Sequence, residues 1–323
     1  MFNIFVTSRI ADSALKMLQE IGNVVVWERE KTLNGQALLN KVKDKDAILT
    51  MVNNNVTDEI LKNSPNLKIV ANCGVGFNNI DIAAAERHGF VVTNTPDVLT
   101  EATADLTWAL ILGIARRVVE GDTFVREGKF TGWLPHLFIG NMVYGKKLGI
   151  IGMGRIGSAV AERALGFHME VVYFNRNRLS KERERELQVQ YMDKEQLLRE
   201  SDFITIHAPL TEETYHLIGR DELKLMKKDA YLINTSRGPL VDEMALYEHL
   251  KSGNIAGAAL DVYEHEPKIV DGLLQLKNTI LLPHIGSATH ETRTQMAELA
   301  AKNIVNVLTG KNPMTPVTKG WRK

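Results

Sequence analysis

The chain alternates short apolar runs of strand length with longer amphipathic segments, and this alternation restricts its fold more than any other feature. It predicts βαβ units, in which parallel strands are covered by helices. The runs are FNIFV, VVVW, AILTM, LKIVANC and FVVTN in a first series, then LGII, VVYF, DFITIH, AYLIN, GAALDV and TILL in a second. Because 323 residues exceed the usual size of one core, we expect two α/β domains, each a doubly wound parallel sheet.

Composition narrows the class of protein. The 39 basic residues balance the 39 acidic ones, so no overall field favours nucleic acid or an anionic membrane, and small partners are expected. A single cysteine, Cys73, excludes an internal disulfide and a multi-cysteine metal site, so we expect no metal and a cytoplasmic protein. The N-terminal apolar run FNIFV is too short for a signal peptide or a membrane span.

Two long helices are expected outside these series. Residues 100–120 carry apolar side chains around most of the circumference, as in a helix buried on several sides. It is either a core helix of one domain or a helix at a domain or subunit interface. Residues 290–308 show apolar residues at helical spacing and form the route back to the first domain, which would then be discontinuous.

The segment LGIIGMGRIGSAVAERAL places glycines in the G-x-G-x-x-G spacing directly after a strand and before a helix. Gly152 would allow the tight turn, Gly154 the approach of a pyrophosphate, and Gly157 close packing of helix on strand. The phosphates would meet the free N–H groups of the helix, so Arg155 and Ile156 are also expected at the cofactor. A turn without a ligand is the alternative.

A second glycine turn, CGVGFNN at residues 73–79, has Asn79 where the third glycine would stand. It suits a dinucleotide less well. Its amides around Val75 and Gly76 are suited to a smaller anion, such as a substrate carboxylate. A plain turn explains the spacing equally well.

Ligands of open parallel sheets bind outside the carboxyl ends of the strands. The polar residues that follow strands of the second series are Arg176 and Arg178, His207, Arg237, Glu264 and Glu266, and His284. An arginine, an acid and a histidine on one rim suit hydride transfer to a 2-oxo acid. Arg237 would bind the carboxylate and polarise the ketone. His284 would supply the proton, and Glu266 would accept its other N–H.

His207 also ends a strand and competes with His284 for the acid role. The segment HAPLTEET indicates a loop that turns over the cofactor, so we assign His207 a structural or cofactor-lining role. The residues alone do not separate the two histidines.

The motifs GMGRIG, INTSRGPLVD, GAALDVYEHEP and LLPHIGSATH, in this order, resemble the D-isomer-specific 2-hydroxyacid dehydrogenases, most closely the glyoxylate/hydroxypyruvate reductase branch. The likeness extends from about residue 45 to 310. It implies a Rossmann dinucleotide-binding domain, residues 99–290, inserted in a flavodoxin-like substrate-binding domain, residues 1–98 and 291–323. It also implies a homodimer joined through the cofactor domains, and reduction of glyoxylate or hydroxypyruvate by NAD(P)H.

The resemblance assigns roles to individual residues. Arg237 resembles the substrate-binding arginine, Glu266 the glutamate, which removes Glu264, and His284 the acid/base histidine, which settles the competition with His207. Asp261 resembles the residue near the nicotinamide carboxamide, and the Val75 and Gly76 amides resemble those that bind substrate carboxylate. Pro209 and Thr235 are expected to line the cofactor.

One segment departs from the family pattern. MVNNNV, residues 51–56, brings three asparagines to a loop expected to border the substrate. Asn53 or Asn55 would then contact a hydroxyl of hydroxypyruvate or of a sugar acid, and a larger substrate such as 2-ketogluconate is the alternative. A simple turn is another interpretation. A different class, the dinucleotide-sensing corepressors, shares the motifs, but the complete Arg, Glu and His set favours an enzyme.

The stretch VVYFNRNR concerns cofactor choice. NAD-binding units place an acid at the end of this strand, for the ribose hydroxyls, but this chain has Asn175 there and no carboxylate before Glu182. Arg176 and Arg178 fall where a 2′-phosphate would lie. We therefore expect NADP(H) to be preferred, with NAD(H) possible. The alternative is that both arginines belong to the charged run RLSKERERE of a solvated helix, and that either cofactor is accepted.

Overall fold

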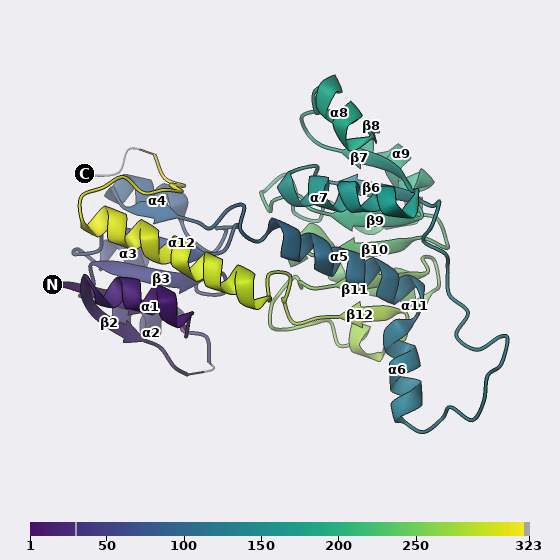
Figure 1. Ribbon diagram of the computed structural model, residues 1–323, viewed down its shortest axis with the longest axis horizontal. Helices are drawn as coiled ribbons and strands as arrows, with labels where there is room; N and C mark the ends of the chain where they lie inside the picture. Colours follow the sequence, from purple (N-terminus) through teal and green to yellow (C-terminus); the bar gives the residue numbers. More distant parts are fainter. Residues whose placement is uncertain (30, 320–323) are drawn as a thin grey trace. The chain divides into compact units, whose positions relative to one another are not determined.

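A computed structural model describes residues 1–29 and 31–319 (Figure 1). The chain divides into two compact units, which we call unit 1, Met1–Leu99 with Ser287–Lys323, and unit 2, Thr100–Gly286. Each unit contains one parallel sheet. The bounds of the two units lie close to the predicted domain limits. Which ligand each unit binds stays a prediction.

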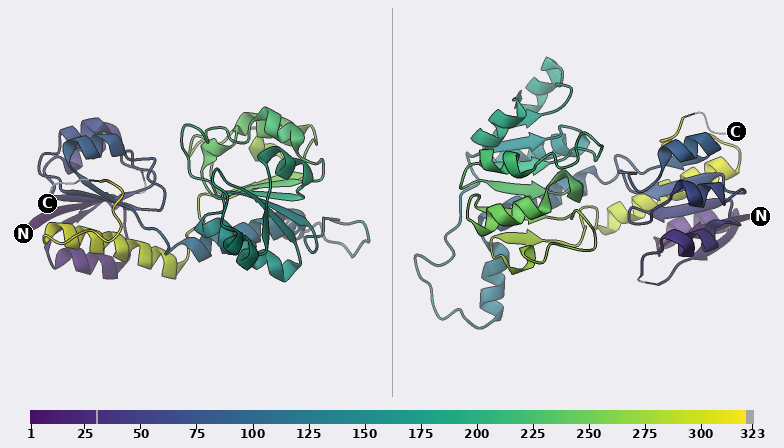
Figure 2. Two further views of the ribbon diagram at one scale, coloured as in Figure 1. Left: turned by 90° about the horizontal axis from the view of Figure 1, so that it is seen from above. Right: turned by 180° about the vertical axis from the view of Figure 1, so that it is seen from behind.

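The sheet of unit 1 has five parallel strands in the order β2-β1-β3-β4-β5, the flavodoxin-like order. They are β1 Phe2–Val6, β2 Gly22–Val26, β3 Ala47–Met51, β4 Ile69–Cys73 and β5 Val91–Thr93. Helices α2 Gly35–Val42, α3 Asp58–Lys62 and α4 Ile82–His88 cover one face, and α1 Asp12–Gln19 and α12 His290–Leu308 cover the other (Figure 2). Strands β3, β4 and β5 are mostly apolar and buried on both faces, whereas the edge strand β2 is partly exposed, with Val25 open to solvent.

Helix α12 has the bounds that the sequence predicted. The hydroxyl of Thr289 caps it by accepting a hydrogen bond from the Thr292 N–H. The helix packs on α1, β3 and β4, and Ile304 is fully buried among them. A segment distant in sequence thus completes the core of unit 1.

The sheet of unit 2 has seven parallel strands in the order β12-β11-β10-β9-β6-β7-β8. They are β6 Lys147–Ile151, β7 Glu170–Phe174, β8 Val189–Tyr191, β9 Phe203–Ile206, β10 Tyr231–Asn234, β11 Gly257–Leu260 and β12 Thr279–Leu281. The order reverses at β6, with β7 on one side and β9 on the other, which is the Rossmann arrangement. The predicted fold class, two doubly wound parallel sheets, is confirmed. Strand β8 was not predicted, because its three residues follow a strongly charged helix.

Two layers of helices cover this sheet. Helices α5 Thr100–Ala115 and α7 Arg155–Ala164 share one core with the sheet, while α9 Lys194–Glu200, α10 Arg220–Leu225 and α11 Glu243–Lys251 share the other. Helix α8 Lys181–Leu187 lies beside β8, and short 3₁₀ turns occur at Leu165–Phe167, Gly238–Leu240 and Leu273–Gln275. None of the helices within residues 1–29 and 31–319 is long and apolar enough to cross a membrane.

The prediction of one helix over residues 100–120 was wrong. Helix α5 ends at Ala115, Arg117 adopts a left-handed φ of 54°, and a separate helix, α6 Val118–Arg126, follows. The carbonyl of Ala115 accepts the N–H of Asn141, 2.8 Å away, so a distant loop takes the place of the next helical turn. Most of α5 is buried, which favours the core-helix interpretation, whereas α6 has no buried residue.

Candidate active site

The glycine loop follows β6 at the reversal of strand order. Gly152 has a φ of +100°, and a Cβ there would come within 2.5 Å of the His207 carbonyl carbon, at the end of β9. A Cβ on Gly157 would lie 2.2 Å from the Gly152 oxygen, so only glycine lets α7 pack this closely. A Cβ on Gly154, the N-cap of α7, would meet nothing within 4 Å. The loop is thus closely packed at Gly152 and Gly157 and has free space at Gly154, an arrangement that fits a bound pyrophosphate.

Asn175 supports this loop. Its Oδ1 accepts a hydrogen bond of 2.7 Å from the N–H of Met153. The residue at the position of the expected ribose-binding acid therefore holds the glycine loop in place.

The two arginines after β7 have different surroundings. Arg178 forms a bidentate ion pair with Glu184, with Nε–Oε1 and Nη2–Oε2 distances of 2.7 and 2.8 Å, and its guanidinium lies over the ring of Tyr191. The hydrogen bonds from Arg178, and then that from Tyr173, lower the pKa of Glu184 to about 2. Arg176 is exposed and makes no hydrogen bond or ion pair with the described residues.

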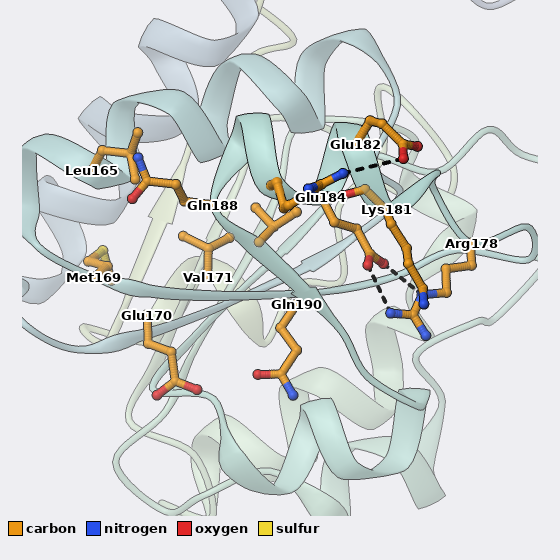
Figure 3. A pocket seen from close by; sticks show the side chains of 12 residues that line it. Leu165, Met169, Glu170, Val171, Arg178, Lys181, Glu182, Glu184, Gln188 and Gln190 are labelled. Atoms are coloured by element: carbon orange, nitrogen blue, oxygen red, sulfur yellow. Dashed lines mark hydrogen bonds and ion pairs between the residues drawn. The ribbon is translucent and has the colours of Figure 1, made fainter.

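Arg178 also lines a hollow of about 720 Å³ beside α8, β7 and β8 (Figure 3). The hollow is lined by Leu165, Met169, Glu170, Val171, Arg178, Lys181, Glu182, Glu184, Arg185, Gln188, Val189 and Gln190. Its charged groups are of both signs, and several are paired with one another. Arg176 is not part of its wall, so the structure separates the two arginines that the sequence treated as one cluster.

The predicted acid and histidine are in contact. His284 Nδ1 lies 2.9 Å from Oε2 of Glu266, while Oε1 of Glu266 accepts the N–H of Tyr263 at 3.1 Å. Burial would raise the pKa of Glu266, but its hydrogen bond and attraction to His284 outweigh burial and leave the pKa below its usual value. Glu266 is therefore an anion at neutral pH, bound to one nitrogen of a ring that is one-third exposed.

The backbone at His284 is unusual, because its φ is +57° in a residue that is not glycine. Asp261, at the end of β11, holds the turn that follows. Its two carboxylate oxygens accept the N–H groups of Ile285 and Gly286, each at 2.7 Å. Asp261 is almost completely buried, and burial raises its pKa. In this structure it positions the His284 turn, a contact that the sequence did not reveal.

Arg237 lies in the turn after β10, directly before the 3₁₀ turn Gly238–Leu240. The side chain of Asn234 fixes this turn by donating to the Arg237 carbonyl at 2.9 Å and accepting the Ser236 N–H at 3.0 Å. Burial lowers the pKa of Arg237, and attraction to Glu266 opposes this shift. A Cβ on Gly238 would overlap the Tyr263 carbonyl at 1.8 Å, so glycine lets this turn pack against the segment that carries Glu266.

Other cofactor-site candidates lie in the same unit. Thr235 is buried, and its hydroxyl lies 2.9 Å from that of Thr107 on α5. Pro209 is exposed in the loop after β9, and its carbonyl accepts the Thr214 hydroxyl. No group of three or more His, Cys, Asp or Glu side chains in the described part of the chain is arranged to hold a metal ion.

The competing residues are engaged elsewhere. His207 Nε2 lies 3.0 Å from the Thr205 hydroxyl, and burial lowers the pKa of His207 to about 3, so the ring is neutral. Glu264 accepts hydrogen bonds from Tyr215 and His216 and lies beside the N–H of Glu243. Unlike His284, His207 has no carboxylate partner among the described residues.

The asparagine loop of unit 1 is held mainly by its own neighbours. Asn53 donates to the Thr32 hydroxyl at 2.9 Å, and the N–H of Asn55 donates to Asn34 at 2.6 Å. Asn54, which the sequence did not single out, is the buried member. Its Oδ1 accepts the N–H of Met51 at 2.9 Å, so these contacts favour the turn interpretation.

The Rossmann strand order of unit 2 and the matches to known proteins define a class: an α/β oxidoreductase that uses a nicotinamide dinucleotide. Residues 108–286 match the family model described as D-isomer specific 2-hydroxyacid dehydrogenase, NAD binding domain. The chain is 51% identical over 320 residues to a glyoxylate reductase of Thermococcus litoralis, covering 98% of this chain and 96% of that one. It belongs to the D-isomer specific 2-hydroxyacid dehydrogenase family.

Solved structures agree. A Thermus thermophilus protein has a TM-score of 0.91 at 42% identity, covering 98% of this chain and all of that one. An NADPH-dependent glyoxylate/hydroxypyruvate reductase of Sinorhizobium meliloti, solved with NADP and malonate, has a TM-score of 0.87 at 32% identity, covering 99% and 98%. The resemblance read from the four motifs is confirmed.

Proposed function

We propose that this protein reduces a small 2-oxo acid, glyoxylate or hydroxypyruvate, to the D-2-hydroxy acid with NAD(P)H. The observation that carries the proposal is the hydrogen bond between Glu266 and His284 in a chain that is 51% identical to a glyoxylate reductase. The dinucleotide, when bound, supplies the hydride. The protein must bind the substrate, orient it and deliver a proton.

His284 is the proposed proton donor. Glu266 accepts the hydrogen bond from Nδ1, which leaves Nε2 as the atom that faces the ketone oxygen. The negative charge of Glu266 stabilises the protonated ring before transfer. As the carbonyl carbon gains a hydride, its oxygen gains the Nε2 proton, and the ring becomes neutral.

Arg237 and the amides of Val75 and Gly76 are the proposed substrate-binding groups. The pKa of Arg237 is lowered by burial, but the group titrates so far above neutrality that its guanidinium remains a cation. It can donate to a carboxylate and to a developing alkoxide at once. Asp261, which holds the His284 turn, is proposed to lie near the nicotinamide carboxamide as well.

Replacing His284 by alanine should lower kcat by about 10²- to 10⁴-fold, because the proton donor is lost. His207→Ala is the matched control: it removes a neutral imidazole with no carboxylate partner, and it should keep most of kcat. The measurement is kcat for the reduction of glyoxylate by the wild type and by each of the two variants. Near-normal kcat in His284→Ala together with a collapse in His207→Ala would contradict the assignment.

We also propose that NADP(H) is preferred and that Arg176 is the main determinant. Arg176 is exposed at the end of β7, whereas Arg178 is already paired with Glu184. Asn175 removes the carboxylate that would repel a 2′-phosphate.

Arg176→Ala should raise the KM for NADPH about tenfold or more and leave that for NADH nearly unchanged, because a charge-assisted phosphate contact is lost. Arg178→Ala is the comparison and should change the NADPH KM less. Both cofactors are compared by kcat/KM. Equal use of NADPH and NADH by the wild type would refute this selector.

A homodimer joined through unit 2 is the proposed assembly, in the cytoplasm. Helix α6 and the segment after it project from the sheet of unit 2 (Figure 1). This region exposes a run of large apolar side chains. They are Val118, Val119, Val125, Phe130, Trp133, Leu134, Ile139, Met142 and Tyr144.

Sedimentation equilibrium of the wild type should give twice the chain mass. Replacing both Trp133 and Ile139 by serine should shift the measured mass toward that of the monomer, because two large apolar side chains are lost from the exposed surface. A monomeric wild type would contradict the proposal.

A further inference from the structure

The turn after β4 in unit 1 has three consecutive carbonyls held by neighbouring groups. The Gly74 oxygen accepts the N–H of Thr95 at 3.0 Å, and the Val75 oxygen accepts the side-chain NH₂ of Asn94 at 2.8 Å. The Gly76 oxygen accepts the side-chain NH₂ of Asn72, also at 2.8 Å. Three successive peptide planes are thereby fixed.

Fixing the carbonyls also fixes the N–H groups. In a trans peptide the N–H points opposite to the carbonyl of the preceding residue. The N–H groups of Val75, Gly76 and Phe77 therefore point away from Thr95, Asn94 and Asn72. None of these three donates a hydrogen bond within residues 1–29 and 31–319. Successive free N–H groups of this kind form a concavity for an anion.

The orientation of the Asn72 amide is itself imposed. Asn79 is buried, and its Nδ2 lies 3.2 Å from Asn72 Oδ1, 3.0 Å from the Asn54 carbonyl and 3.2 Å from the Met51 carbonyl. An atom surrounded by three oxygens must be the donor nitrogen. Asn72 consequently turns its oxygen toward Asn79 and its NH₂ toward Gly76.

We propose that Asn72 and Asn94 are positioning residues that hold the N–H groups of Gly76 and Phe77 outward to receive the carboxylate of the substrate. This inference rests on the proposed function. The Phe77 N–H joins the expected Val75 and Gly76 amides, and the side chains of Asn72 and Asn94 orient the peptides. Aspartate could not replace either residue, because a carboxylate cannot donate to a carbonyl oxygen. An alanine would leave the carbonyl without its partner and the peptide free to turn.

The test compares an anionic and a neutral substrate of the same reaction. Wild type and Asn94→Ala are assayed with glyoxylate and with its methyl ester, which lacks the carboxylate charge. Asn94 is partly exposed, so its removal should be tolerated better than that of the buried Asn72; Asn72→Ala is the second variant. Asn278→Ala is the matched control, since its amide also donates to backbone carbonyls, those of Leu250 and Ala256 in unit 2.

We expect the ratio of kcat/KM for glyoxylate to that for the ester to fall about tenfold in Asn94→Ala and Asn72→Ala, through the KM for glyoxylate. It should not change in Asn278→Ala. An unchanged ratio in Asn94→Ala, whether or not total activity falls, would overturn the proposal, because a purely structural residue affects both substrates equally.

A binding measurement separates this proposal from the proposed function. Oxalate is added to the protein while the backbone amide resonances of Gly76 and Phe77 are followed by NMR. Saturable shifts in the wild type, weakened in Asn94→Ala and retained in Asn278→Ala, would support the anion site even if glyoxylate were not reduced. No shift at either amide in the wild type would overturn it.

Discussion

All seven strands of unit 2 are parallel, so their carboxyl ends lie on one edge of the sheet, and the proposed chemistry depends on this constraint. The glycine loop, His207, Arg237 and the turns that carry Glu266 and His284 all leave strands at that edge. Contacts between adjacent loops then fix the details. Gly152 packs directly against the His207 backbone, and Gly238 packs against Tyr263.

The proposed site contains groups that would react and groups that hold them in position. His284 has a left-handed backbone, which costs about 1–3 kcal/mol in a residue with a side chain. The two hydrogen bonds to the Asp261 carboxylate offset that cost, because hydrogen bonds to a charged group are the stronger kind. Asparagine amides serve the same purpose in unit 1, where Asn72 and Asn94 hold backbone carbonyls. In both places polar side chains, of which Asp261 and Asn72 are buried, determine where a backbone segment points.

Local patterns were enough to predict the parallel-sheet fold, the strand-to-helix glycine loop and helix α12. Apolar periodicity and glycine spacing depend only on residues that are close in the chain, so a single sequence is enough to recognise them. The four motifs also identified the family. His284 and Glu266 are 18 positions apart, and they could be paired in advance because each follows a strand of the same parallel sheet. The resemblance then removed the competing Glu264 and His207.

Features that depend on distant partners could not be predicted. The break at Arg117 follows from Asn141 occupying the Ala115 carbonyl, and nothing in residues 100–120 signals it. Among the three asparagines, Asn53 and Asn55 were singled out, yet Asn54 is the buried one, because Thr7 and Leu33 contact it from other segments. Arg176 and Arg178 look alike in sequence, but Glu184 pairs with only one of them.

The most direct test of the account is the turnover of wild-type protein with NADPH and a panel of glyoxylate, hydroxypyruvate, pyruvate and 2-ketogluconate, compared by kcat/KM. We expect glyoxylate or hydroxypyruvate to give the highest value. A higher value for 2-ketogluconate would contradict the substrate assignment and favour the sugar-acid alternative. No turnover of any 2-oxo acid with NADPH or NADH would contradict the central claim and favour a dinucleotide-sensing protein.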